Sequence, residues 1–147
     1  MLKTDQSRHL ILKKKMTNET NIQTVQQVYA VFGKQNVEGI LNSFTDDVSW
    51  NDGGYPDLPY AKIRNGKNEM MSFFIELGST IAFTEFAPQE FYSDNDTVIV
   101  KGYFAGNAID SGKSFESDWV HILKFRGDKI FSFQAFKDTA AMIAAIK

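Results

Sequence analysis

The 147-residue sequence contains no cysteine and only two histidines. Without cysteine the chain has no disulfide, no thiolate nucleophile and no cysteine-ligated metal site. This composition is compatible with a reducing cytosol, and we predict a cytoplasmic location. One of the two histidines, His9, stands in a polar N-terminal segment, so we also predict no dedicated metal site.

Long apolar runs and excess positive charge are also missing. No apolar run approaches the roughly 20 residues that a membrane span needs, so we predict no membrane partner. The formal net charge of −2 offers no attraction to a phosphate backbone, so we predict no nucleic-acid partner. No G-x-G-x-x-G, P-loop or nucleophile elbow is present, which leaves a covalent or cofactor-dependent mechanism without support.

Apolar residues make up 43% of the chain and thirteen residues are phenylalanine, enough to form one hydrophobic core. The first 15 residues are polar and basic, and their short apolar stretch is too short for a signal peptide. We therefore treat residues 1–16 as a loose N-terminal arm and residues 17–147 as a single domain.

Helical signals dominate the first half of the chain. A capping box at Thr20 and Gln23 precedes apolar residues at helical spacing, which predicts a helix that ends near Gly33. Asn36 is placed to cap a second, shorter helix that runs to Phe44. A third helix is expected over residues 66–77, with Gly78 as its stop.

Between the second and third helices we predict a short strand, Val48–Asp52, on which Trp50 and Asp52 share a face. Residues 53–65 contain two prolines and two glycines, which predicts a loop.

The second half of the chain alternates with the period of two that is typical of strands. Strands are expected over residues 81–92 and 97–109, followed by a hairpin from Phe115 that turns at Arg126–Gly127–Asp128. A short final helix, 139–146, is expected to be capped by Asp138. Segregated helices and an antiparallel meander indicate an α+β fold, in which a curved sheet packs against three N-terminal helices as a cone.

The hairpin carries the most informative residue. Trp119, His121 and Leu123 fall at every second position and therefore share one face of the strand, together with Phe125. A titratable imidazole among apolar side chains is a candidate for function. The following strand has phenylalanine on both faces, at positions 131, 133 and 136, and we expect it to be covered on both.

Three segments carry a family resemblance: ILNSFTDDVSWNDG, the Asn65–Gly66 helix start, and WVHILKFRGDKIFSFQAFKDTAAM. Over roughly residues 20–146 the chain resembles the nuclear transport factor 2-like superfamily, in its SnoaL-like and ketosteroid isomerase-like branch. This resemblance implies the cone fold with a pocket inside it. It leaves the function open among isomerases, cyclases, hydrolases, dehydratases and binding domains.

The resemblance to ketosteroid isomerases also implies roles for single residues. The spacing of TDDVSWND places Asp52 at the general-base position, and counting back from Gly127 places His121 at the position of an oxyanion donor. The position of a helix tyrosine is occupied by Val28, and the neighbouring Tyr29 is expected to point elsewhere. The isomerase triad is therefore incomplete.

Each candidate has two interpretations. Asp52 is either a base whose pKa burial raises, or a strand-end aspartate bonded to loop amides. His121 is either a hydrogen-bond donor to an enolate oxygen or a proton shuttle paired with Asp52, or it is a core histidine bonded to a carbonyl or water.

We expect Trp50, Trp119 and Phe133 to form the pocket walls, and Tyr55 to lie on a lid loop with Leu58 and Tyr60. The predicted ligand is a small hydrophobic carbonyl compound, polyketide- or steroid-like, and the predicted chemistry is cofactor-free isomerisation or cyclisation. The alternative is a non-catalytic module that binds a small molecule or serves dimerisation. We also expect a homodimer formed through the outer face of the sheet.

Overall fold

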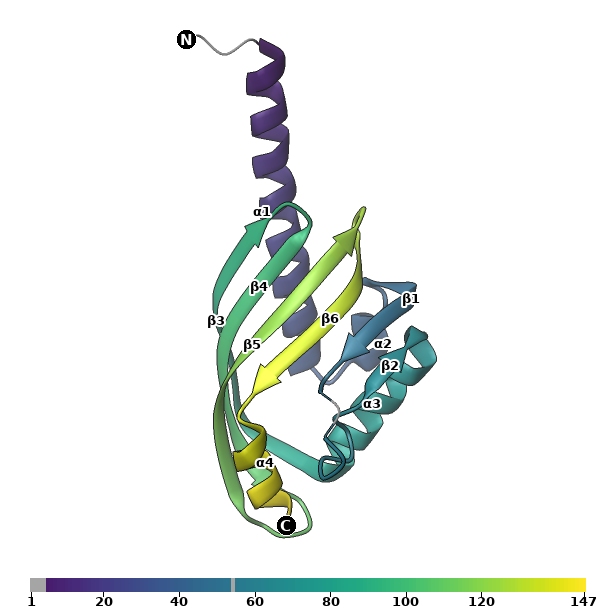
Figure 1. The fold of residues 1–147 in the computed structure, drawn as a ribbon, viewed down its shortest axis with the longest axis vertical. Coiled ribbons are helices and arrows are strands. Elements are labelled where there is room, and N and C mark those ends of the chain that lie inside the picture. Colours follow the sequence, from purple (N-terminus) through teal and green to yellow (C-terminus); the bar gives the residue numbers. More distant parts are fainter. Residues whose placement is uncertain (1–4, 54) are drawn as a thin grey trace.

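The fold is α+β, with a curved sheet and helices that pack against one of its faces (Figure 1). It is seen in a computed structural model that describes residues 5–53 and 55–147. The helices are α1 (Asp5–Gly33), α2 (Val37–Leu41), α3 (Gly66–Thr80) and α4 (Thr139–Ile146). The strands are β1 (Phe44–Asn51), β2 (Ile63–Asn65), β3 (Ile81–Asp94), β4 (Thr97–Ala108), β5 (Ser114–Arg126) and β6 (Lys129–Lys137).

The six strands form one sheet in the order β2-β1-β6-β5-β4-β3. The four C-terminal strands are the predicted antiparallel meander, whereas β1 pairs with β6 in parallel and carries β2 on its other edge. The pairing of β1 with β6 brings the N-terminal half of the chain against the end of the meander. Residues 49–51 therefore lie beside residues 132–134 in the sheet.

The sheet curves because its registers shift at several points. In the β3–β4 pairing the register shifts between Phe83 and Glu85 and again between Pro88 and Glu90. An extra residue in one strand bends it and increases its twist, and an edge strand tolerates the proline. The concave face is filled by aromatic side chains from α1, α3 and the long strands, which confirms the predicted cone.

Helix α1 is longer than predicted. It begins among the described residues at Asp5, and in Figure 1 its first turns project beyond the sheet. Thr20 lies inside the helix, where its hydroxyl donates a hydrogen bond to the Met16 carbonyl, so the predicted capping box is wrong. The separation of residues 1–16 as an arm stays a prediction: residues 5–16 are exposed but helical, and residues 1–4 lie outside the described residues.

The segment predicted to be a loop, residues 53–65, contains the short strand β2. Leu58 and Tyr60 in this segment are buried in the core, so they do not form an exposed lid. Helix α3 continues past Gly78 to Thr80, and β1 starts four residues earlier than predicted, at Phe44. Phe136 is 50% exposed, so the predicted covering of β6 on both faces is wrong at this residue.

Two capping predictions are confirmed. The Asn36 side chain accepts a hydrogen bond from the Gly39 amide at the start of α2. The Asp138 side chain accepts one from the Ala141 amide at the start of α4. Within residues 5–53 and 55–147, no helix is long and apolar enough to cross a membrane.

Candidate functional site

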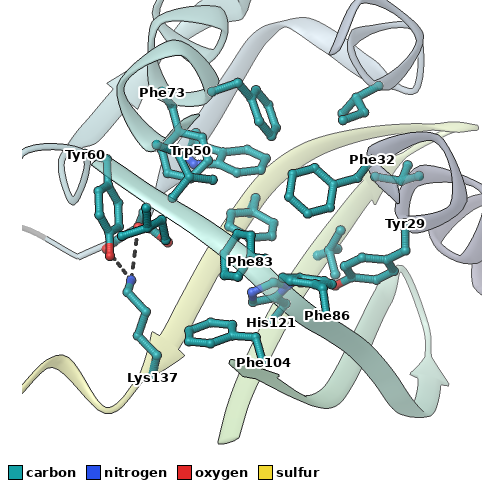
Figure 2. A pocket seen from close by; sticks show the side chains of 18 of the residues that line it. Tyr29, Phe32, Trp50, Tyr60, Phe73, Phe83, Phe86, Phe104, His121 and Lys137 are labelled. Atoms are coloured by element: carbon teal, nitrogen blue, oxygen red, sulfur yellow. Dashed lines mark hydrogen bonds and ion pairs between the residues drawn. The ribbon is translucent and has the colours of Figure 1, made fainter. Parts of the chain in front are cut away.

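A cavity of about 80 Å³ lies between the concave face of the sheet and helices α1 and α3. Most of its lining is phenylalanine and aliphatic side chains (Figure 2). The lining groups with side-chain N or O atoms are Tyr29, Trp50, Asp52, Tyr60, His121 and Lys137. An apolar cavity with a few inward polar groups is the usual form of a small-molecule site.

His121 is held by a hydrogen bond to a tyrosine of the first helix. The Tyr29 hydroxyl lies 2.7 Å from His121 Nδ1, and the two rings stack with their centroids 5.9 Å apart. Val28 also lines the cavity, but Tyr29 points inward as well, so the expectation that Tyr29 points elsewhere is wrong. His121 is therefore bonded to a side chain, and the predicted bond to a carbonyl or water is not what the structure shows.

Aromatic rings fix the orientation of the imidazole. The indole of Trp119 stacks against His121 with the ring centroids 4.1 Å apart, and Phe133 meets the imidazole edge-on at 4.7 Å. Trp50 in turn stacks on Phe133 at 3.8 Å. Such contacts leave the imidazole little freedom to rotate, so its Nε2 atom keeps one direction.

Burial keeps the Tyr29–His121 pair neutral. It lowers the pKa of His121 from 6.5 to about 3, and the nearby Lys137 charge acts in the same direction. Burial also raises the pKa of the Tyr29 phenol. The neutral imidazole is therefore favoured near neutral pH, and the proton shuttle paired with Asp52 stays a prediction. The predicted hydrogen-bond donor role needs only the neutral ring.

The hydrogen-bond pattern selects one tautomer of His121. If the Tyr29 hydroxyl donates to Nδ1, both Tyr29 and Nδ1 are satisfied and Nε2 carries the proton. In the other tautomer the Tyr29 proton has no acceptor among the described residues. We therefore assign Nε2–H, for which the described residues provide no hydrogen-bond partner.

Asp52 and Lys137 form an ion pair in a second polar part of the cavity, apart from the Tyr29–His121 pair. Lys137 Nζ lies 3.0 Å from Asp52 Oδ2 and 3.0 Å from the Asp52 carbonyl oxygen. Only 8% of the Asp52 side chain and 6% of the Lys137 side chain are exposed. Among the described residues the predicted contact with loop amides is absent, and the Gly53 amide donates to Asn51 instead; Gly54 lies outside the described residues.

The charges around Asp52 act on its pKa in opposite directions. Burial raises the pKa of the carboxyl, whereas Lys137 and, more weakly, Arg64 lower it. The pKa of the Tyr60 phenol is raised, mainly by burial and to a smaller extent by the Asp52 charge. The Tyr60 hydroxyl is buried and has no hydrogen-bond partner among the described residues.

The structure brings some of the predicted site residues together and leaves others apart. Asp52, His121, Trp50, Phe133 and Val28 all line the cavity, although Asp52 and His121 do not bond to each other. Two predicted wall residues are not in the lining.

Trp119 lies beneath His121 in the core, 2% exposed. Tyr55 is 47% exposed and lines a separate surface depression. The predictions that Trp119 and Tyr55 form the cavity wall are therefore wrong.

Three polar lining residues were missed: Tyr29 as an inward group, Lys137 and Tyr60. The alternation along β6 contains a signal for Lys137, because Phe133 and Lys137 are four residues apart and share a face. In Figure 2, Lys137 and Tyr60 lie at one side of the site and Tyr29 at the other. The described residues contain no cluster of histidine and carboxylate side chains that could hold a metal ion.

Comparison with known proteins shows which family the chain belongs to. The family model of the SnoaL-like domain matches residues 25–133, which include the Tyr29–His121 pair and Asp52. The chain belongs to the SnoaL-like family. Its match stops just before Lys137, which completes the ion pair. No curated protein matches this SnoaL-like chain.

Solved structures with the nuclear transport factor 2-like fold resemble this SnoaL-like domain. A protein of unknown function from Burkholderia pseudomallei is 27% identical, with a TM-score of 0.81 over 87% of this chain and 98% of its own. TerC, co-crystallised with polyporic acid, is 26% identical, with a TM-score of 0.78 over 86% and 98%.

A Catenulispora acidiphila protein with a ketosteroid isomerase-like fold, in complex with trimethylamine, is similar in fold alone. It is 16% identical, with a TM-score of 0.70 over 84% of this chain and 91% of its own.

Proposed function

We propose that the cavity binds a small carbonyl compound and catalyses cofactor-free acid–base chemistry of the isomerase or cyclase type. Asp52 is the base that removes a proton next to the carbonyl, and His121 Nε2–H donates a hydrogen bond to the carbonyl oxygen. The observation that carries this proposal is the neutral His121, fixed by Tyr29 and with its Nε2–H unpartnered at an apolar cavity.

A fixed neutral donor suits an oxygen that gains negative charge. When a proton leaves the carbon next to a carbonyl, charge moves to the oxygen, and a donor already in place stabilises it without reorganisation. The Tyr29 hydroxyl strengthens the donor, because it polarises the imidazole through Nδ1. The aromatic walls exclude water and so increase the electrostatic effect.

The volume limits the ligand. The cavity of about 80 Å³ is smaller than a roughly 150 Å³ cavity that takes up benzene. A ligand of this size is a small aldehyde or ketone, and a polyketide- or steroid-like compound would require wall side chains to move. The complex of the 26% identical TerC with polyporic acid supports a ligand site in this fold, and it motivates a test of larger compounds too.

Deuterium exchange tests the chemistry without knowledge of the natural substrate. A base beside a bound carbonyl accelerates exchange of the adjacent protons in D₂O, which NMR follows for a panel of small ketones and aldehydes. We expect exchange by the wild-type protein and its loss in Asp52→Asn. Replacement of His121 by Phe should lower the rate roughly 10²- to 10³-fold.

Asp118→Asn is the matched control, because Asp118 is exposed and lies on the opposite face of β5. The proposal is contradicted if the wild-type protein exchanges no carbonyl compound that it binds. Equal exchange rates in Asp52→Asn and wild type would remove Asp52 from the role of base.

A non-catalytic binding module is the second candidate, and the Asp52–Lys137 ion pair favours it. An ammonium 3.0 Å from the carboxylate makes the carboxylate a weaker base. If the protein is a non-catalytic binding module, Asp52→Asn should keep the ligand affinity of the wild type, and neither protein should catalyse exchange. Ligand affinity is measured by the fluorescence of Trp50 at the cavity wall.

We also propose that two copies associate through the outer face of the sheet. Tyr92, Ile99 and Ile122 are cross-strand neighbours on that face, and Tyr92 and Ile99 are 56% and 40% exposed. Light scattering of Ile99→Glu should show a monomer where the wild type is a dimer. Ile75→Glu, at an isoleucine of α3 that is 66% exposed, should leave the dimer intact.

A further inference from the structure

Lys137 differs from the other lysines of the described residues in the burial of its side chain. Its side chain is 6% exposed, whereas the side chains of the other lysines in ion pairs, Lys14, Lys62, Lys67 and Lys147, are 57%, 60%, 32% and 65% exposed. Lys137 is the last residue of β6 and pairs with Trp119, so it lies on the concave face, as the cavity lining confirms. A lysine is rarely buried unless a partner or a chemical role holds it there.

The contacts of Lys137 provide a proton acceptor within the site. Among the described residues, both oxygen atoms that contact Nζ belong to Asp52, at 3.0 Å each: the carboxylate Oδ2 and the main-chain carbonyl. Burial raises the pKa of Asp52, and charge separation is costly in an apolar surrounding. Asp52 is thus placed to accept a proton from Lys137, and this transfer leaves a neutral amine, the form that attacks carbonyl groups.

His121 lies where it can reach the oxygen of a carbonyl at Lys137. Lys137 is opposite Trp119 and His121 is opposite Ala135, so Lys137 and His121 are diagonal neighbours on one face. Diagonal neighbours in an antiparallel pair are roughly 7–8 Å apart at the backbone, so one bound carbonyl compound can contact both side chains. The Lys137 charge also acts on His121, whose pKa it lowers.

Lys137 and Asp52 can be reached from outside the cavity. Both residues line the cavity, and both also line the surface depression of about 380 Å³ that Tyr55 borders. Asp52 and Lys137 thus border both the cavity and a depression open to solvent, which is where we expect a carbonyl compound to enter.

We propose that Lys137 forms a Schiff base with an aldehyde or ketone bound in the cavity. This inference rests on the proposed function, since it takes a carbonyl compound as the ligand, and it adds a covalent step and a substrate class. Compounds with an unhindered carbonyl are substrates, whereas esters and amides of the same size are not, because they do not form stable imines.

The step balances within the site. Lys137 gives one proton to Asp52. The Nζ lone pair then forms a bond to the carbonyl carbon, and the C–O π electrons move to the oxygen. His121 Nε2–H stabilises the negative charge on that oxygen. Protonated Asp52 then passes its proton to that oxygen, and the nitrogen returns a second proton to Asp52. This second proton leaves with the hydroxyl as water when the C–O bond breaks. The products are an iminium at Lys137, one water and a carboxylate on Asp52 that pairs with the iminium.

Reductive trapping tests the step on the full chain. The protein is incubated with butanal and cyanoborohydride near neutral pH, and the modified lysine is identified by peptide mass spectrometry. Lys137 should be alkylated at least about tenfold faster than exposed Lys101, which has no such surroundings. Lys101→Met should keep the labelling at Lys137, and Lys137→Met should remove this fast phase.

Binding of butanal, followed by the fluorescence of Trp50, separates this inference from the proposed function. If butanal binds but only surface lysines are alkylated, the Schiff base is refuted and the proposed carbonyl site stands. If no carbonyl compound changes the fluorescence and Lys137 is not alkylated, both proposals fail. The wild-type peptide map decides the question even if Lys137→Met does not fold.

Discussion

The neutral imidazole of His121 makes the stability of the protein depend on pH. Its pKa is about 3 in the folded chain and 6.5 when the side chain is unperturbed. Between these values the unfolded chain binds the extra proton, so stability is complete above the unfolded pKa and falls as the pH falls toward the folded one. The full difference corresponds to at most about 5 kcal/mol, and the part lost between about pH 7 and about pH 5 is about 2 kcal/mol.

Replacement of His121 by Gln removes this dependence, because an amide stays neutral at every pH. We expect the urea-unfolding free energy of the wild type to fall by about 2 kcal/mol more than that of His121→Gln over this range. Asp52 titrates with the opposite sign, since burial raises its pKa, but it is present in both proteins and cancels in the difference. Equal pH dependence in the two proteins would refute a neutral buried His121.

The control for this measurement is the other histidine. His9 is exposed on the projecting part of α1. His9→Gln should therefore keep the pH dependence of the wild type.

Three substitutions test the surroundings of the site. Tyr29→Phe should destabilise the protein by about 1–3 kcal/mol in urea unfolding, because it leaves His121 Nδ1 buried without a donor; unchanged stability would mean that the hydrogen bond is not formed. Gly102→Ala should cost about 1–3 kcal/mol, because its Cβ would collide with the indole of the buried Trp119; a neutral effect would show that Trp119 is free to shift. Asp138→Ala should cost about 1 kcal/mol through loss of the α4 cap, with no change in ligand affinity, and a changed affinity would contradict a purely capping role.

The meander and its inward face could be predicted from the sequence because their signals are local. Alternation places Trp119, His121 and Leu123 on one face whatever the rest of the chain does, and a Gly–Asp turn after Arg126 closes the hairpin. Alternation likewise puts Trp50 and Asp52 on one face, and both line the cavity, although β1 ends one residue before Asp52.

The partners of these residues could not be predicted, because they depend on packing between distant segments. Whether Val28 or Tyr29 reaches His121 depends on how α1 is rotated about its axis, and neighbouring helix positions differ by about 100°. Lys137 faces Asp52 only because β6 pairs with β1 in parallel, a pairing with no local signal.

The N-terminal part of α1 has no local signal either. Its helical residues are exposed all round, without the apolar stripe that marks a packed helix.

The tautomer and ligand response of His121 form the most direct test of the site. Nitrogen NMR of protein with isotope-labelled histidine reports which imidazole nitrogen carries the proton. We predict a neutral ring protonated at Nε2, unchanged from neutral pH down to about pH 5, whose Nε2 signal shifts when a small ketone or aldehyde is added. A ring that titrates near its ordinary pKa, or an Nε2 signal that responds to no carbonyl compound, would contradict the proposed role of His121 as the carbonyl-binding donor.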